Sequence, residues 1–170
     1  MARSALEGGK TMLKKSIAMM VLAVFFMAAA WSLQAADLYV TTTADQASGS
    51  LREAITIANS NGEDDTIHLP AGTYILKGAA GEDANASGDL DIDTGHSIAI
   101  KGEGVKTTFI DGNQVDRILH ILKGTVTVED VTFQKGKPLD GYGECEKGED
   151  GGGILNRGTL TITNCQLRNN

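Results

Sequence analysis

The most informative stretch of the sequence occurs twice, as Gly124-Thr-Val-Thr-Val-Glu-Asp-Val-Thr-Phe-Gln-Lys-Gly136 and again as Gly158-Thr-Leu-Thr-Ile-Thr-Asn-Cys-Gln-Leu-Arg-Asn-Asn170. The glycine and the two threonines that follow are identical, and apolar residues recur at matching positions. Such alternation is typical of a strand with one buried face. A unit that cannot bury its own apolar row is typical of solenoids, whose neighbouring turns complete the core. The repeat therefore predicts a β-solenoid, in which the second copy follows the first after one or two turns plus the loop from Lys137 to Gly152.

The alignment of the two copies also assigns roles to single residues. Cys165 takes the place of Val131, which indicates a small buried hydrophobe, although export would also permit a disulfide bond with Cys145. Turn-end asparagines in solenoids stack from one turn to the next and satisfy buried backbone groups. We expect this role for four residues at the ends of the repeats: Asp130, Asn164, Asn169 and Asn170.

The remaining strands are short and are bounded by Gly, Asn or Asp. A β-branched run at 38–43 reads as a strand. Further candidate strands are 66–69, 73–76, 89–92, 97–100, 107–110, 117–122, 125–133, 153–155 and 159–167. No second helical pattern interrupts them, which disfavours alternating strand–helix units.

One helix is predicted at about residues 50–60. Leu51, Ala54, Ile55 and Ala58 form a single apolar stripe. Ser50 begins a capping box that Glu53 completes, and Asn61-Gly62 supplies a C-terminal stop. An amphipathic helix of this length is suited to covering the open end of a solenoid.

The segment 1–35 has the three parts of a secretory signal peptide. Lys14 and Lys15 precede an apolar run from Ile17 to Ala30, and small residues close it at Ala35. Met12 would give a shorter signal, so residues 1–11 are a candidate for a misassigned start. The run is shorter than the roughly 20 residues of a membrane span. Counting on through Trp31 and Leu33 makes the length borderline, so an uncleaved membrane anchor is the alternative. We expect export, cleavage near Ala35 and no membrane span in the mature chain.

The mature chain is acidic. Four of the 15 basic and one of the 22 acidic side chains lie before residue 36, which leaves 11 basic and 21 acidic side chains. A surface with this excess of negative charge repels phosphate backbones and anionic lipids, and so argues against nucleic-acid partners. It suits a secreted protein or one that binds cations.

Four stretches of the sequence resemble known bacterial β-helix proteins. The stretches Gly49-Ser-Leu-Arg-Glu-Ala-Ile55 and Asp65-Thr-Ile-His-Leu-Pro-Ala-Gly-Thr-Tyr74 are similar to the CSLREA domain, with Gly49 in place of its cysteine. Gly151-Gly-Gly-Ile154 and Leu167-Arg-Asn-Asn170 resemble the GGA[I/L] and FxxN repeats of polymorphic outer-membrane proteins. The resemblance covers about residues 37–170.

The resemblance implies a right-handed parallel β-helix on the surface of a bacterium, in its outer membrane or secreted, often as the front of a longer chain. Residues 36–170 would then be the N-terminal cap and first turns of a β-helix that is incomplete at its C-terminus. The leading hypothesis is a scaffold for adhesion or display, without catalysis, in contact with cell-surface polysaccharide or other envelope components. Its bare C-terminal edge would also allow self-association.

The best candidate for a ligand site is an acidic loop. Its oxygen-bearing residues alternate as in part of a calcium-binding loop and are Asp83, Asn85, Ser87, Asp89 and Asp91. Thr94 stands where such a loop would carry a bidentate glutamate, so a looser Ca²⁺ site is the metal hypothesis. The simpler interpretation is a solvated acidic face on a half-buried strand.

An enzyme is the alternative. A β-helix glycoside hydrolase would need two carboxylates about 5–10 Å apart, for which the candidates are Asp89, Asp91 and Asp93, or Asp111 with Asp116. A β-helix polysaccharide lyase would pair Ca²⁺ with a base such as Arg117 or Lys101. The histidines His68, His96 and His120 are isolated in the sequence, and His120 reads as a core or half-buried residue rather than a ligand.

Overall fold

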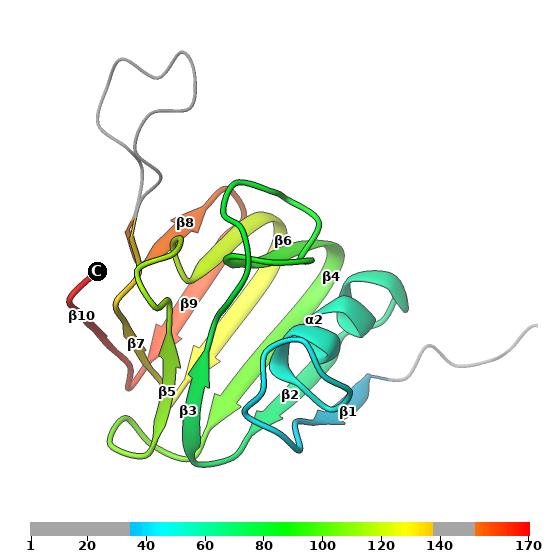
Figure 1. Cartoon of the computed structure of the whole chain (residues 1–170). Helices are drawn as coiled ribbons and strands as arrows, with labels where there is room; N and C mark the ends of the chain where they lie inside the picture. The colour runs from blue at the N-terminus through cyan, green and yellow to red at the C-terminus, as the bar shows by residue number, and fades with distance from the viewer. Residues whose placement is uncertain (1–34, 138–151) are drawn as a thin grey trace, which may run out of the picture. The chain divides into compact units, whose positions relative to one another are not determined.

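The computed structural model of the chain describes residues 35–137 and 152–170. These residues form a right-handed parallel β-helix of about four turns with one short helix, as predicted (Figure 1). Every strand pairing in the described residues is parallel. The predicted signal peptide lies outside the described residues apart from its last residue.

Two parallel sheets enclose the core. The larger sheet has the order β1-β2-β4-β6-β8, with β9 also paired to β6, and the smaller has the order β10-β7-β5-β3. The strands of the larger sheet are β1 (Ala36–Tyr39), β2 (Asp65–Leu69), β4 (Leu90–Gly102), β6 (Leu119–Glu129), β8 (Ile154–Asn156) and β9 (Thr159–Thr163). Those of the smaller sheet are β3 (Gly72–Ile75), β5 (Thr108–Asp111), β7 (Thr132–Gln134) and β10 (Gln166–Arg168). Each turn runs from the larger sheet to the smaller one.

The internal repeat corresponds to one turn of the β-helix. Thr125 pairs with Thr159 in the larger sheet and Thr132 pairs with Gln166 in the smaller one, so the strand register matches the alignment of the two copies. Most of the loop between the copies, 138–151, lies outside the described residues together with Cys145. Inward rows of Ile, Leu and Val from successive turns stack into one core, as an alternating strand pattern requires.

Two predicted strands are divided by a corner of the solenoid. The candidate strand 125–133 is split between β6 and β7 at Asp130, and the candidate 159–167 is split between β9 and β10 at Asn164. Both corner residues have positive φ, at 58° and 48°, which ends a strand and which Asp and Asn tolerate better than most residues. The Asn164 side chain donates to the Asp130 carboxylate of the preceding turn. The predicted stacking of turn-end side chains is therefore confirmed for this pair.

Two other predicted pairs of strands are continuous. The candidates 89–92 and 97–100 form the single strand β4, which has irregular register near Asp93. The candidates 117–122 and 125–133 share β6. The register shifts between β4 and β6 near Asp93 let these strands bend without ending. The alternation of apolar and polar residues does not show whether a strand bends or ends at such a point.

The helix α2 (Leu51–Ser60) and the preceding loop complete the first turn. The four residues of the predicted apolar stripe are all buried. In Figure 1, α2 lies over the inner side of the larger sheet near β2 and β4, where a strand of the smaller sheet would otherwise follow β1. The preceding loop lies beside β3, because Asp45 accepts a hydrogen bond from the Lys77 amide at 2.8 Å. The predicted capping role of the helix is therefore confirmed for the core of the first turn.

Candidate functional site

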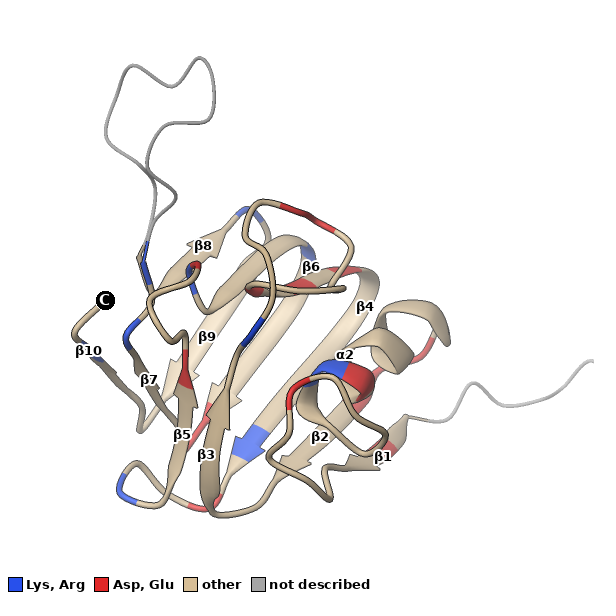
Figure 2. Ribbon diagram, viewed as in Figure 1, with Lys and Arg blue, Asp and Glu red and all other residues tan. Residues whose placement is uncertain are grey.

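Two neighbouring strands and a loop build a cluster of two carboxylates and an imidazole. Asp91 of β4 and His120 of β6 are register partners, so their side chains lie side by side on the same face of the larger sheet. The loop 76–89, which connects β3 to β4, brings Asp83 to the same point. Figure 2 shows acidic residues on this loop where it passes above β4 and β6. We call these three residues the acid–histidine cluster.

The distances within the acid–histidine cluster are short. His120 Nδ1 lies 3.2 Å from Asp83 Oδ1 and 3.3 Å from Asp91 Oδ1. One ligand atom from each of the three residues lies within 4.8 Å of the others. The side chains of His120 and Asp91 are only 2% and 1% exposed, whereas that of Asp83 is 63% exposed. Two members of the cluster are therefore buried, and the side formed by Asp83 is open to solvent.

The two buried members, Asp91 and His120, have side-chain atoms without hydrogen bonds. Asp91 Oδ1 and both ring nitrogens of His120 have no hydrogen-bond partner among the described residues, although the carboxylates are near. The Nδ1–oxygen separations are those of a hydrogen bond, but the directions are not. Buried polar atoms are normally satisfied, and an exception calls for an explanation.

Burial strongly perturbs the titration of this region. Burial raises the pKa of Asp91 to about 7, and the nearby negative charge of Asp89 adds to the effect. Burial likewise raises the pKa of Asp89 to about 7, assisted by Asp116 and opposed by the Arg117 guanidinium. Burial lowers the pKa of His120, as does the charge of Arg117. Burial and the neighbouring carboxylates thus shift both carboxyl groups toward their protonated forms.

A set of hydrogen bonds holds the loop against the sheet. The Asn85 amide donates to Asp91 Oδ2 at 3.1 Å, and Asn85 Oδ1 accepts from the Asp91 amide at 3.2 Å. From the helix, the buried Arg52 donates to the carbonyls of Asp89 and Gly88, at 2.6 and 2.8 Å. These contacts place Asp91 and the loop in fixed positions around the acid–histidine cluster.

The structure brings together only part of the predicted calcium loop. Asp83 and Asp91 meet, whereas Asn85 is occupied by the contacts above. Ser87 Oγ donates to the Ala79 carbonyl, and Asp89 accepts from Arg117 Nε at 3.0 Å. Three of the five residues thus make other hydrogen bonds, and calcium binding stays a prediction.

His120 was missed as a candidate because the sequence separates it widely from Asp83 and Asp91, the two acids that it meets in the fold. The interval from Asp91 to His120 is shorter than the interval of the visible repeat, from Gly124 to Gly158. The available signal was the matching triplets Leu90-Asp-Ile92 and Leu119-His-Ile121. The prediction that the histidines are isolated is wrong for His120, and also for His68, whose Nε2 lies 2.7 Å from Asp37 Oδ1. The expected burial of His120 is confirmed.

The residues considered for catalysis form structural contacts. Asp111 Oδ2 accepts from Lys135 at 2.7 Å and from Gln134 at 2.8 Å. Asp116 is buried, and its carboxylate accepts from the Gly81 amide and the Arg117 amide. The remaining candidates, Asp93 and Lys101, lie near oppositely charged neighbours, Lys123 at 3.1 Å and Glu129 at 3.9 Å respectively.

The outer face of the larger sheet is a second candidate site. Its rows of outward side chains, read across the strands by register, are Ser97-Thr125-Thr159, Asp37-Thr66-Ala99-Thr127-Thr161 and Tyr39-His68-Lys101-Glu129-Thr163. We call these three rows the hydroxyl face. Strands in a sheet lie about 4.8 Å apart, so the small hydroxyl side chains form a regular array.

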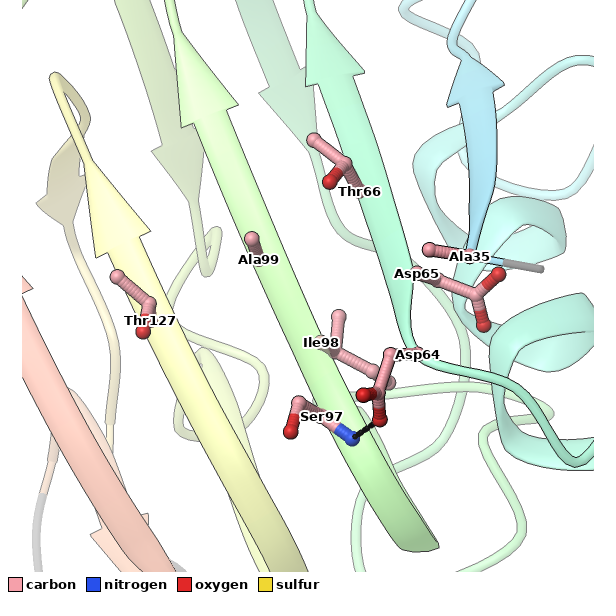
Figure 3. Close-up of a pocket in the computed structure, with 8 residues that line it drawn as sticks. All are labelled: Ala35, Asp64, Asp65, Thr66, Ser97, Ile98, Ala99 and Thr127. Atoms are coloured by element: carbon pink, nitrogen blue, oxygen red, sulfur yellow. Dashed lines mark hydrogen bonds between the residues drawn. The ribbon is translucent and has the colours of Figure 1, made fainter. Parts of the chain in front are cut away.

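The first strands of the hydroxyl face border a shallow hollow. Figure 3 shows Thr66, Ala99 and Thr127 on three successive strands, with Asp64 bound to the Ser97 amide at 2.7 Å. The neighbouring row begins with Tyr39, which is 67% exposed and stacks on the His68 ring with centroids 4.6 Å apart. The face thus combines hydroxyls, charges and one accessible aromatic ring.

Comparison of the chain with protein-family models, with curated proteins and with solved structures finds no match to any of them. None of the helices among residues 35–137 and 152–170 has the length and apolar character needed to cross a membrane.

Proposed function

We propose that the chain is an exported β-helix scaffold that acts in adhesion or display at the cell surface or outside the cell, without catalysis of its own. In this proposal the hydroxyl face is the adhesive surface, and its ligand is polysaccharide. Export rests on the signal-like segment 1–35, and membership of the CSLREA group rests on the motifs at residues 49–55 and 65–74.

The regular rows of the hydroxyl face carry this proposal. Thr66, Ala99, Thr127 and Thr161 are in register across four strands, and the neighbouring rows add further hydroxyl groups. Short side chains on a sheet give a surface that a flat, repetitive ligand can approach closely. Hydroxyl groups both donate and accept hydrogen bonds, as the hydroxyls of a sugar chain do.

The charges and the aromatic ring favour polysaccharide over other repetitive ligands. Tyr39 offers an exposed ring to the apolar face of a sugar, supported from below by its stack on His68. Acidic side chains at Asp37, Asp64 and Glu129 disfavour a polyanion such as nucleic acid. The hydrogen bonds that hold Asp111 and Asp116 support a scaffold rather than a hydrolase that uses this pair.

The proposal is tested by retention on insoluble polysaccharides. The secreted chain is incubated with cellulose, chitin and peptidoglycan, and the bound fraction is measured over a range of protein concentrations. Thr127→Lys places a long charged side chain in the centre of the hydroxyl face, and we expect it to weaken binding at least about tenfold through steric exclusion. Tyr39→Ala should weaken binding through loss of the ring.

Thr73→Lys is the matched control, because Thr73 is exposed on β3 of the smaller sheet. It introduces the same charge on a different surface and should leave retention unchanged. Equal binding by the Thr127→Lys and Thr73→Lys variants would exclude the hydroxyl face as the adhesive surface. Release of reducing or unsaturated sugar ends during incubation would exclude a scaffold without catalysis.

A further inference from the structure

We propose that Asp83, Asp91 and His120 bind one divalent transition-metal ion of the zinc type. The inference is independent of the adhesive role of the hydroxyl face. It depends on three side chains that come from a loop and two strands and point their ligand atoms toward one place.

The two separations from His120 Nδ1 match ligand–ligand edges of a tetrahedral metal site, and the third, between the two carboxylates, is within 4.8 Å. A tetrahedron with bonds of about 2.0–2.1 Å, the usual values for zinc with imidazole nitrogen and carboxylate oxygen, has ligand–ligand edges of about 3.3 Å. The two edges from His120 Nδ1 are 3.2 Å to Asp83 and 3.3 Å to Asp91.

The burial of two of the ligands is the second, independent observation. Asp91 Oδ1 and His120 Nδ1 are buried and have no hydrogen-bond partner among the described residues. An unsatisfied buried polar atom destabilises the fold, and an unsatisfied buried charge does so more strongly. A cation between the two atoms would satisfy both at once and would neutralise the two carboxylates.

The donor set selects the kind of ion. One imidazole nitrogen with two carboxylate oxygens suits zinc and related transition metals. Calcium takes six to eight oxygen ligands, and the other oxygens of the predicted calcium loop are bound elsewhere, as Ser87 is to the Ala79 carbonyl. The inference thus retains two ligands of the predicted calcium site, adds His120 and replaces calcium by a zinc-type ion.

The ion would join the loop 76–89 to the sheet. Asp91 and His120 are held in adjacent strands, whereas Asp83 lies on the loop and is largely exposed. With three protein ligands, the exposed side leaves the fourth position to water. Metal binding would therefore join Asp83 to the strands and should reduce the motion of the loop 76–89.

The experiment uses the full chain after treatment with a chelator, with Cys145→Ser and Cys165→Ser introduced to remove thiol ligands. Zn²⁺ is added and binding is measured by isothermal titration calorimetry, with Co²⁺ absorption as a second readout of coordination geometry. We expect one ion per chain, tetrahedral Co²⁺ bands and a Tm that rises by several degrees at saturating Zn²⁺. Excess Ca²⁺ at millimolar concentration should not displace the ion.

The variants are chosen so that loss of folding cannot imitate loss of a ligand. Asp83→Asn changes an exposed residue and should weaken binding at least about tenfold without changing the circular dichroism spectrum. His120→Gln removes the nitrogen ligand and should abolish the tetrahedral Co²⁺ bands. Asp93→Asn is the matched control on the same strand, since Asp93 is exposed and lies near Lys123. Its affinity should equal that of the parent.

Three results would overturn the inference. One is the absence of Zn²⁺ binding by the metal-free parent. Another is equal affinity in the parent, Asp83→Asn and His120→Gln proteins, which would place the ion elsewhere. The third is displacement of Zn²⁺ by equimolar Ca²⁺, which would identify an oxygen-rich calcium site instead.

Discussion

At the scale of the residue, Gly49 shows how one position can depend on the lack of a side chain. Its φ is +78°, and a Cβ built there would lie 2.1 Å from Thr41 Oγ1. Both the backbone conformation and the close neighbour exclude an ordinary side chain. The CSLREA motif that this stretch resembles has a cysteine at this point, where this chain has glycine.

We predict that Gly49→Ala lowers the free energy of unfolding by about 1–2 kcal/mol or more, from the left-handed φ and the clash with Thr41. Urea unfolding measures the change. Gly95→Ala is the control, because nothing lies within 4 Å of a Cβ at Gly95 and its φ is outside the left-handed region. A Gly49→Ala protein as stable as the Gly95→Ala protein would contradict the strain argument.

Asp111 provides a pH-dependent contribution to stability. Burial opposes its ionisation, but hydrogen bonds from Lys135, the Asn113 amide and Gln134 outweigh burial and hold the pKa below its ordinary value. A carboxyl group with a lowered pKa in the folded state stabilises the fold above its unfolded pKa, and the stabilisation is lost as the pH falls through the folded pKa.

We therefore predict that Asp111→Asn destabilises the chain near pH 7 and that the difference from the parent narrows below about pH 4. Chemical unfolding of both proteins between pH 7 and pH 2.5 tests this. A difference that stays constant across the range would show that the carboxylate charge at Asp111 contributes nothing.

At the scale of the element, the helix α2 was predictable but its main polar contact was not. Ser50 Oγ accepts from the Glu53 amide, as the capping box predicts, whereas the Glu53 carboxylate accepts from the amide of Gly49 and not from that of Ser50. Arg52, beside the apolar stripe, would be expected to be solvated, yet it is buried and forms a two-point ion pair with Asp45. The partners that bury Arg52 come from loops, whose positions no periodicity encodes.

Arg52→Ala should lower the free energy of unfolding by about 3–5 kcal/mol, because it leaves Asp45 as an unpaired buried charge and frees the carbonyls of Gly88 and Asp89. Arg52→Lys should recover only part of the loss, since an ammonium group cannot reproduce the planar fork of a guanidinium. The exposed Lys123→Ala variant, which also removes a paired cation, should change stability by less than about 0.5 kcal/mol. Equal losses in the free energy of unfolding for the Arg52→Ala and Lys123→Ala proteins would contradict a stabilising role for the buried Arg52–Asp45 ion pair.

At the scale of the whole molecule, the repeat predicted the solenoid but not the length of chain in each turn. In the larger sheet, Asp65 pairs with Ile98, Ile98 with Val126 and Val126 with Leu160, and the middle interval is the shortest of the three. Only the last interval recurs in recognisable sequence, because loops of different length separate strands that stack in register. Asp91 and His120 lie one turn apart across the β4–β6 interval, which no sequence repeat marks. For this reason the sequence predicted the two carboxylates of the cluster but not its histidine.

The last described turn leaves its apolar row uncovered. Ile162 is 40% and Leu167 50% exposed, whereas their partners one turn earlier, Val128 and Phe133, are fully buried. We predict that the chain expressed by itself associates through this turn, because a bare strand edge with an apolar row is a pairing site. Light scattering after size-exclusion chromatography measures the mass. Ile162→Lys with Leu167→Lys should yield a monomer, and a monomeric parent would contradict the prediction.

The helix α2 then limits how far such association can extend. A solenoid with bare apolar rows at both ends would add copies head to tail into fibres of any length. In this molecule α2 and its preceding loop already occupy the interior of the first turn, so only one end can accept a partner through its core. When the chain is expressed by itself, two copies joined through this turn would leave only helix-covered interiors outside, and we expect the assembly to stop at two.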